Sequence, residues 1–385
     1  MKTKVTLNAI KHCAVILFVS LSLLDVEASD ANTASEFHPV DSNRIPDILT
    51  MISGRVRGNY ERIKTWQGEK AVIIDYIYEG LAAEKTFKTN TDGLGEIPKI
   101  VKRRVECITQ FALDIERDFL YVSNYWEKPS HYTDLESGRD LGTKSAPDFK
   151  RSIVTPEYYI HCRPNTMRDG SIINRKAVKE ALRDCPTCDG PSVFDPRELF
   201  GLPLQPVWVT FPRMIKVINE RGEYNVDGYR LQIEERISGD ITEYRIQKPG
   251  KLSRDSKYKS DPENYLFKTR TFSSAKGFNV ILEEVTRPNG KLFQKFTWDY
   301  VLIDGVYLPS KTTKQNFRLD NGKISFEKKC TFKNSQINHP IPAEKFTYKN
   351  LGLENGDKFI DKILDKEYRY EAATGTLEPF ERNSR

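Results

Sequence analysis

The pair Cys185-Pro-Thr-Cys188 has the spacing in this sequence with the most direct chemical meaning. Two cysteines at this spacing carry out thiol-disulfide exchange when they open a helix after a strand, because the helix dipole lowers the thiol pKa. Here the helix-like stretch 174–183 precedes the pair, which is the wrong order. A zinc site needs a second Cys/His pair, and the nearby partners are Cys162 and His161. We therefore favour a structural disulfide from Cys162 to Cys185 or Cys188.

The other reactive residue types form no catalytic pattern. None of the five histidines falls in an H-x-x-x-H or H-x-H spacing, which disfavours a zinc hydrolase. The nucleophile elbow G-x-S-x-G and the glycine-rich phosphate loops do not occur. The acidic pairs Glu234-Glu235 and Glu283-Glu284 lie in strand-like segments, where adjacent side chains point to opposite faces. The sequence predicts a protein that is not an enzyme, with no cofactor and no metal site.

The N-terminal residues resemble an export signal. Lys2, Lys4 and Lys11 precede an apolar run at 13–24, and small residues follow at 26–28, so we expect residues 1–28 to be a signal peptide. This predicts a periplasmic or otherwise exported protein. No later segment has the ~20 apolar residues of a membrane helix, so the protein is expected to be peripheral to membranes at most.

The charge of the chain indicates a solvated surface. The formal net charge is +6, and basic and acidic residues are interleaved along the sequence. Because no block of like charge stands out, a nucleic-acid partner is not expected.

The pattern becomes regular after a polar stretch at 29–44, which we expect to be a flexible leader. Apolar residues then recur at steps of three, four and seven and form one stripe of an amphipathic helix of about five turns. Pro46 suits its first turn. The stripe consists of Ile45, Ile48, Leu49, Ile52, Val56 and Ile63. We expect Ile48, Ile52 and Val56 to cover a sheet.

From Trp66 onward the sequence has the short period of β-strands. The first candidates are 71–78, 117–126 and 153–161. A second series is separated by Gly-Asp, Asn-Gly, Asp-Gly and Asn-Gly pairs at 239–240, 289–290, 304–305 and 321–322. Such pairs accept the positive φ angles of two-residue hairpins. The second series runs through 228–237, 241–247, 278–286, 291–303, 306–315 and 323–333. Consecutive hairpins predict an antiparallel meander that curves strongly.

Two further segments differ from the strands in composition. Residues 162–206 contain many prolines and the two close cysteines, and we interpret them as an insertion in a domain that spans 45–370. Two separate domains remain possible for a chain of this length. The polar residues 371–385 are expected to form a loose tail.

The hairpin around Asp304-Gly305 has one aromatic face. With this pair as the turn, Leu302 faces Tyr307 and Tyr300 faces Pro309. Alternation places one set of side chains on the same face: Phe296, Trp298, Tyr300, Leu302 and Tyr307. This face is either ordinary core or the wall of a cavity that accepts acyl chains, which gain ~0.8 kcal/mol per buried methylene.

These features together resemble a known family. The helix at 45–68 and the segments Trp-Asp-Tyr-Val-Leu-Ile-Asp-Gly-Val-Tyr-Leu-Pro at 298–309 and Ile-Asn-His-Pro-Ile-Pro-Ala-Glu-Lys-Phe-Thr at 337–347 are similar to the LolA-like outer-membrane lipoprotein-sorting proteins. The resemblance covers 45–68 and 278–370. It implies an α+β fold in which an unclosed barrel, made by a strongly curved antiparallel β-sheet, holds the N-terminal helix on its concave face. The family's cavity arginine cannot be assigned to a position of this chain.

The resemblance implies a function in the cell envelope. We expect a non-enzymatic protein that binds lipid acyl chains or lipoproteins. A structural, interaction or envelope-stress-sensing protein with an envelope protein partner is the alternative. A thiol-disulfide enzyme at Cys185 and Cys188 is a remote one.

Overall fold

The computed structural model describes residues 36–90, 96–126, 128–144, 149–166, 172–181, 207–251 and 265–380. The expected signal peptide at 1–28 and both Cys185 and Cys188 lie outside the described residues. The helices are η1 (Ser42–Arg44), α2 (Ile45–Tyr60), α3 (Leu81–Asn90), α5 (Val207–Arg221), η6 (Ser274–Lys276), η7 (Ala343–Phe346) and η8 (Tyr348–Leu351). The strands of the N-terminal half are β1 (His38–Pro39), β2 (Thr65–Glu79), β3 (Ile100–Asp114), β4 (Phe119–Tyr125), β5 (Ser130–Asp134), β6 (Asp140–Lys144), β7 (Phe149–Val154), β8 (Tyr158–Thr166) and β9 (Ile172–Ala181). Those of the C-terminal half are β10 (Asn225–Val226), β11 (Tyr229–Arg230), β12 (Gln232–Ser238), β13 (Ile241–Lys251), β14 (Tyr265–Ser273), β15 (Asn279–Thr286), β16 (Leu292–Ile303), β17 (Val306–Phe317), β18 (Ile324–Ile337), β19 (Lys358–Asp361), β20 (Lys366–Glu371) and β21 (Thr376–Pro379).

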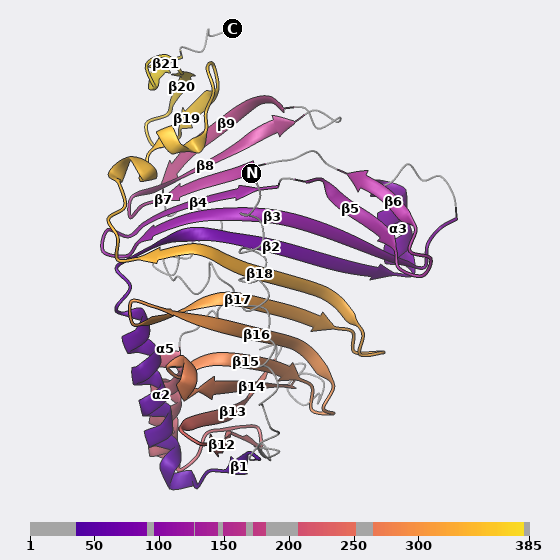
Figure 1. Cartoon of the computed structure of the whole chain (residues 1–385), viewed down its shortest axis with the longest axis vertical. Helices are drawn as coiled ribbons and strands as arrows, with labels where there is room; N and C mark the ends of the chain where they lie inside the picture. Colours follow the sequence, from indigo (N-terminus) through magenta and orange to yellow (C-terminus); the bar gives the residue numbers. More distant parts are fainter. Residues whose placement is uncertain are drawn as a thin grey trace, which may run out of the picture.

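One large curved sheet dominates the molecule (Figure 1). Within the described residues it contains 19 strands. Antiparallel pairing leads from β1 through β12 to β18, passes to β2, β3 and β4, and continues through β7 and β8 to β9. The sheet does not close among these residues, because β1 and β21 are paired on one side only. The predicted strongly curved, unclosed antiparallel sheet is therefore present.

The predicted pairs at 239–240, 289–290, 304–305 and 321–322 all lie in connections between strands, but only those at 239–240 and 304–305 form two-residue turns. The other two pairs lie in longer loops, where the amide of Arg287 donates to the carbonyl of Lys291 and the amide of Arg318 to that of Lys323. Asp304 and Gly305 both have positive φ, at 49° and 76°, and Ile303 pairs with Val306 across them. Gly239, Gly290 and Gly322 also have positive φ. The expected partners Leu302–Tyr307 and Tyr300–Pro309 are correct. These short Gly-containing turns fix the register because each adopts the backbone twist that a tight hairpin requires.

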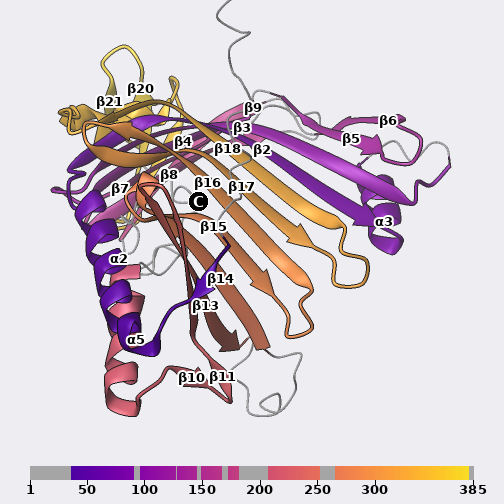
Figure 2. The ribbon, with the colours of Figure 1, turned by 60° about the horizontal axis from the view of Figure 1, so that its bottom comes forward.

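Two helices lie under the curved part of the sheet formed by β12 to β18 (Figure 2). α2 buries Ile48, Ile52 and Val56 in a hydrophobic cluster that also contains Phe211 of α5 and Trp298 of β16. α2 is tied to the sheet at Asn59, whose side chain exchanges two hydrogen bonds with the backbone of Tyr307 on β17. The helices thus pack against this part of the sheet and share its hydrophobic core.

Several expectations for the flanking segments are wrong. The helix-like stretch at 174–183 forms strand β9, which pairs with β8 and, in parallel, with β19. Residues 162–166 belong to β8, so the interpretation of 162–206 as an insertion fails at its start. Part of the expected flexible leader is also regular, because β1 pairs with β12. The expected loose tail forms the hairpin of β20 and β21 up to residue 379.

Candidate ligand-binding cavity

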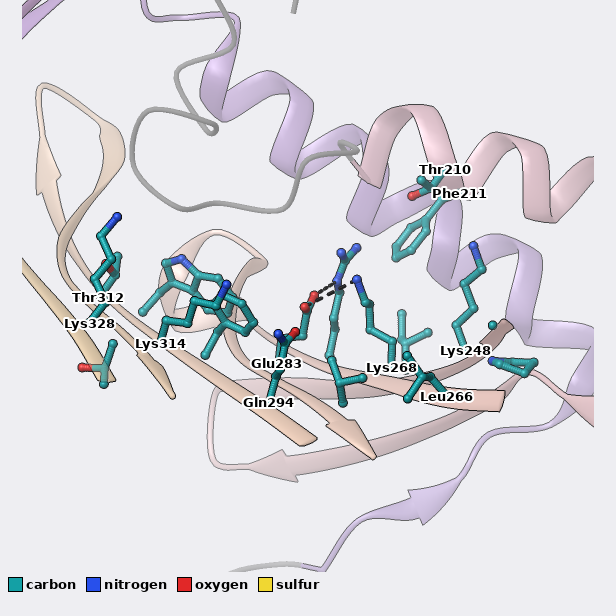
Figure 3. A pocket seen from close by; sticks show the side chains of 18 of the residues that line it. Thr210, Phe211, Lys248, Leu266, Lys268, Glu283, Gln294, Thr312, Lys314 and Lys328 are labelled. Carbon is teal, nitrogen blue, oxygen red and sulfur yellow. Dashed lines mark hydrogen bonds and ion pairs between the residues drawn. The ribbon is translucent and has the colours of Figure 1, made fainter. Parts of the chain in front are cut away.

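A cavity of about 800 Å³ lies between the sheet strands β13–β18 and helix α5 (Figure 3). α5 contributes Thr210, Phe211 and Met214 to its lining. The remaining lining residues come from the sheet. Ligand pockets commonly have volumes of roughly 300–1,000 Å³, so the cavity is large enough for a small ligand.

Strand register arranges the sheet side of the cavity in two rows. Directly opposed residues of an antiparallel pair point to the same face, so paired positions on successive strands line up across the sheet. The first row, from β13 to β18, is Ile246, Arg270, Glu283, Phe296, Lys314 and Lys328. The second row is Lys248, Lys268, Val285, Gln294, Asn316 and Phe326. Apolar, basic and other polar side chains are therefore interspersed over one continuous surface.

Aromatic side chains form the apolar part of the lining. Phe296 and Trp298 stack on β16 with ring centroids 5.7 Å apart and an interplanar angle of 8°. From the opposite side, Phe211 of α5 contacts Phe272 of β14 at 5.7 Å between centroids. The indole Nε1 of Trp298 is buried and has no hydrogen-bond partner in the described part of the chain. The apolar part of the lining is thus largely aromatic.

An ion pair crosses the middle of the first row. Arg270 Nε lies 2.6 Å from Glu283 Oε2, and Lys268 Nζ lies 3.6 Å from Glu283 Oε1 (Figure 3). Glu283 is buried, with 5% of its surface exposed. Glu283 is the one acidic residue among the described residues that line the cavity. Its negative charge therefore offsets only part of the positive charge of the basic residues around it.

Three other lysines of the lining have no such compensation. For Lys248, Lys314 and Lys328 the described residues provide no carboxylate within 4.0 Å, and their side chains extend from the sheet into the cavity (Figure 3). Burial lowers the pKa of Lys314, and the charge of Lys328 on the paired strand lowers it further. Burial, followed by the charges of Arg270 and Lys268, likewise lowers the pKa of Lys248. The cavity is therefore electropositive.

The five residues of the predicted aromatic wall have three different positions. Phe296 and Trp298 line the cavity. Tyr300 is buried core, with its hydroxyl donating to the carbonyl of Val280 at 2.9 Å, and Tyr307 packs against the same core. Leu302 is 55% exposed, so its assignment to the wall is wrong. It lies two residues before the Asp304-Gly305 turn, opposite Tyr307.

The helix that lines the cavity is α5. Ile48, Ile52 and Val56 of α2 are buried, but in the described structure the helical part of the lining comes from α5. The sequence analysis missed α5, although Val207, Phe211, Met214, Ile215 and Ile218 follow a helical spacing. Pro212 lies inside this helix and obscured the pattern.

Cys162 is a buried free thiol on β8, so the disulfide predicted for it is absent from this structure. Burial, reinforced by Asp357, raises the pKa of its thiol to about 12. A bond between Cys185 and Cys188 remains a prediction because both lie outside the described residues. In the described ranges, no group of three or more His, Cys, Asp or Glu side chains is placed to hold a metal ion. No helix within those ranges is long and apolar enough to cross a membrane.

Comparison with known proteins finds similarity to solved structures and none at the level of sequence. No family model matches the sequence, and neither does any curated protein. A DUF1329 family protein from Desulfovibrio piger has 11% identity and a TM-score of 0.30, with 80% of this chain and 98% of that chain covered. A LolA superfamily protein from Nitrosomonas europaea has 11% identity and a TM-score of 0.31 over 79% of this chain and 99% of that one. An outer membrane lipoprotein-sorting protein domain from Vibrio parahaemolyticus has 9% identity and a TM-score of 0.30, covering 78% and 97%. Two of these three structures thus carry the LolA or lipoprotein-sorting names of the family that the sequence resembles.

Proposed function

We propose that this protein binds lipid acyl chains, free or as part of a lipoprotein, in the cavity between β13–β18 and α5. The observation that carries the proposal is an 800 Å³ space lined by Phe211, Met214, Phe296, Trp298 and Phe326. These side chains come from a helix and from strands of a meander whose register is fixed by tight turns. A pre-formed apolar cavity is the standard setting for an apolar ligand.

The energy available from such a cavity is sufficient for stable binding. Each buried methylene contributes ~0.8 kcal/mol, so about ten methylenes contribute roughly 8 kcal/mol before the costs of association. The proposal includes no chemical step: the protein acts as a carrier or sensor in the cell envelope after export, and is not an enzyme.

The first experiment tests for a bound ligand. The full-length protein is purified under mild conditions, extracted with organic solvent and analysed by mass spectrometry. A lipid present at a substantial fraction of the protein concentration is expected. Absence of lipid, together with no binding of an added fluorescent fatty acid, would reject the proposal.

A pair of tryptophan variants locates the ligand. Gln294 lines the cavity from β16, so Gln294→Trp should fill part of the space and weaken fatty-acid binding by about tenfold or more. Gln315 lies on the opposite face of the neighbouring strand β17, paired with Lys295 and Glu327, and none of these three residues lines the cavity. Gln315→Trp is therefore the matched control. Equal affinities of the two variants would place the ligand elsewhere.

A further inference from the structure

The cavity contains more positive charge than the protein itself neutralises. The basic lining residues are Lys248, Lys251, Lys268, Arg270, Lys314 and Lys328. Lys251 forms an ion pair with Asp227, which lies outside the lining, and Glu283 is the single lining carboxylate among the described residues. Glu283 already forms ion pairs with Arg270 and Lys268. An acyl chain alone needs none of these charges.

Lys314 and Lys328 form the centre of this excess charge. They lie directly opposite each other on β17 and β18, on the face that lines the cavity. Like charges in directly opposed strand positions destabilise a sheet. Lys314 also lies over the rings of Phe296 and Phe326, 5.1 and 6.0 Å from their centroids, so its ammonium group stays next to the apolar lining.

Two observations point to an anionic acceptor on the ligand. The first is that the described residues place no carboxylate within 4.0 Å of Lys314 or Lys328, so the charge of this pair is not offset by an acid. The second is that Lys248, another lysine of the lining, also has no such partner in the described part of the chain. Anionic oxygens of a ligand would offset these charges and accept hydrogen bonds from the ammonium groups.

We infer that the cavity selects amphiphiles with an anionic, phosphate-bearing headgroup, held at Lys314 and Lys328 with the acyl chains against the aromatic lining. This deepens the proposed function and rests on it. The headgroup removes the repulsion between the two lysines, and the apolar residues on either side of them contact the adjoining chains. An anion held by ammonium groups in a partly desolvated site gains more than it would at an exposed surface.

The test compares two lipids that differ in headgroup charge. Dihexanoyl phosphatidylglycerol and dihexanoyl phosphatidylcholine have the same chains, and glycerol phosphate represents the headgroup without chains. Calorimetric titration of the full-length protein should give at least about tenfold tighter binding of the phosphatidylglycerol, and little binding of glycerol phosphate.

Variants assign this preference to the lysine pair. The double variant K314Q/K328Q should reduce the preference to near unity, because it weakens the binding of phosphatidylglycerol more than that of the zwitterionic phosphatidylcholine. Removing the repulsion should also leave its thermal stability unchanged or higher. The control K311Q/K329Q removes the same charge from exposed positions on the same two strands, and it should keep the preference.

The possible outcomes separate the two proposals. Equal binding of both lipids, or a preference that survives K314Q/K328Q, would overturn the headgroup inference and leave lipid binding standing. Binding of neither lipid would overturn both. Binding of glycerol phosphate as tight as that of phosphatidylglycerol would mean a site for free anions, which also overturns the inference.

Discussion

Arg270 on β14 and Glu283 on β15 face each other across the sheet and form a buried ion pair, with 2.6 Å between Nε and Oε2. The pair lies in the middle of the row that lines the cavity. The side chains of Arg270 and Glu283 are 12% and 7% exposed. Water therefore solvates neither charge well, and each depends on the opposite charge of its partner.

Glu283→Gln should therefore destabilise the protein by about 3 kcal/mol or more, because it leaves Arg270 buried without a counter-charge. Urea unfolding measures the loss. The matched control is Glu284→Gln, one residue along and on the opposite face, whose partner Lys295 is 3.3 Å away and partly exposed. That change should cost less than about 1 kcal/mol. Similar losses for both variants would contradict a special role of the buried pair.

Asn59 provides a second specific link, between α2 and the sheet. Its Nδ2 donates to the carbonyl of Tyr307 at 2.9 Å, and its Oδ1 accepts from the amide of Tyr307 at 2.7 Å. Asn59→Ala removes both bonds and should cost about 2 kcal/mol, since the backbone N–H and C=O of Tyr307 both lose their partner. Thermal unfolding would measure this. Thr50→Ala, an exposed position of the same helix, is expected to change stability by about 0.5 kcal/mol or less.

The hairpins of the meander could be predicted because their signals are local. Asp304-Gly305 and the other Gly-containing turns specify a positive φ within two residues, and the strand register follows from them. The stretch at 174–183 was misread for the opposite reason. Val178, Ala181 and Leu182 have a helical spacing, whereas β9 is held as a strand by β8 and by β19, which lies some 180 residues further on.

The full set of residues that line the cavity could not be predicted from any single segment of the sequence. Phe296 and Trp298 could be placed on one face from alternation along β16 alone. Lys314 and Lys328 share that face only because the β16–β17 and β17–β18 registers both hold, past an irregularity at Asp299/Tyr300. The helical side of the cavity is α5, which interior Pro212 made hard to recognise.

Lys70 on β2 should make stability depend on pH. It is 8% exposed, and burial lowers its pKa from 10.5 to about 8. A lysine whose folded pKa is depressed binds fewer protons in the folded than in the unfolded state between these two values. Its destabilising contribution is therefore complete below about pH 8 and is relieved as the pH rises toward 10.5.

Lys70→Met should accordingly raise stability at pH 7 and flatten the rise between pH 8 and 10.5 that the wild type shows in urea unfolding. The full effect corresponds to about 3 kcal/mol. Lys333→Met, at an exposed position of β18, is the control and should leave the pH profile unchanged. A Lys70→Met profile parallel to that of the wild type would show that this lysine titrates normally.

Phe211 tests whether α5 closes the cavity. It is 3% exposed and packs edge-on against Phe272, so Phe211→Ala should cost about 3–4 kcal/mol through lost burial and an enlarged cavity. Because the new space adjoins the proposed ligand site, a long-chain fatty acid should recover part of this loss by binding the folded state. Val209 on the same helix is 38% exposed, and Val209→Ala should change neither stability nor ligand affinity appreciably. The measurement is the shift in unfolding temperature with and without fatty acid. If the ligand stabilised Phe211→Ala no more than it stabilised Val209→Ala, α5 would not form the wall that the ligand touches.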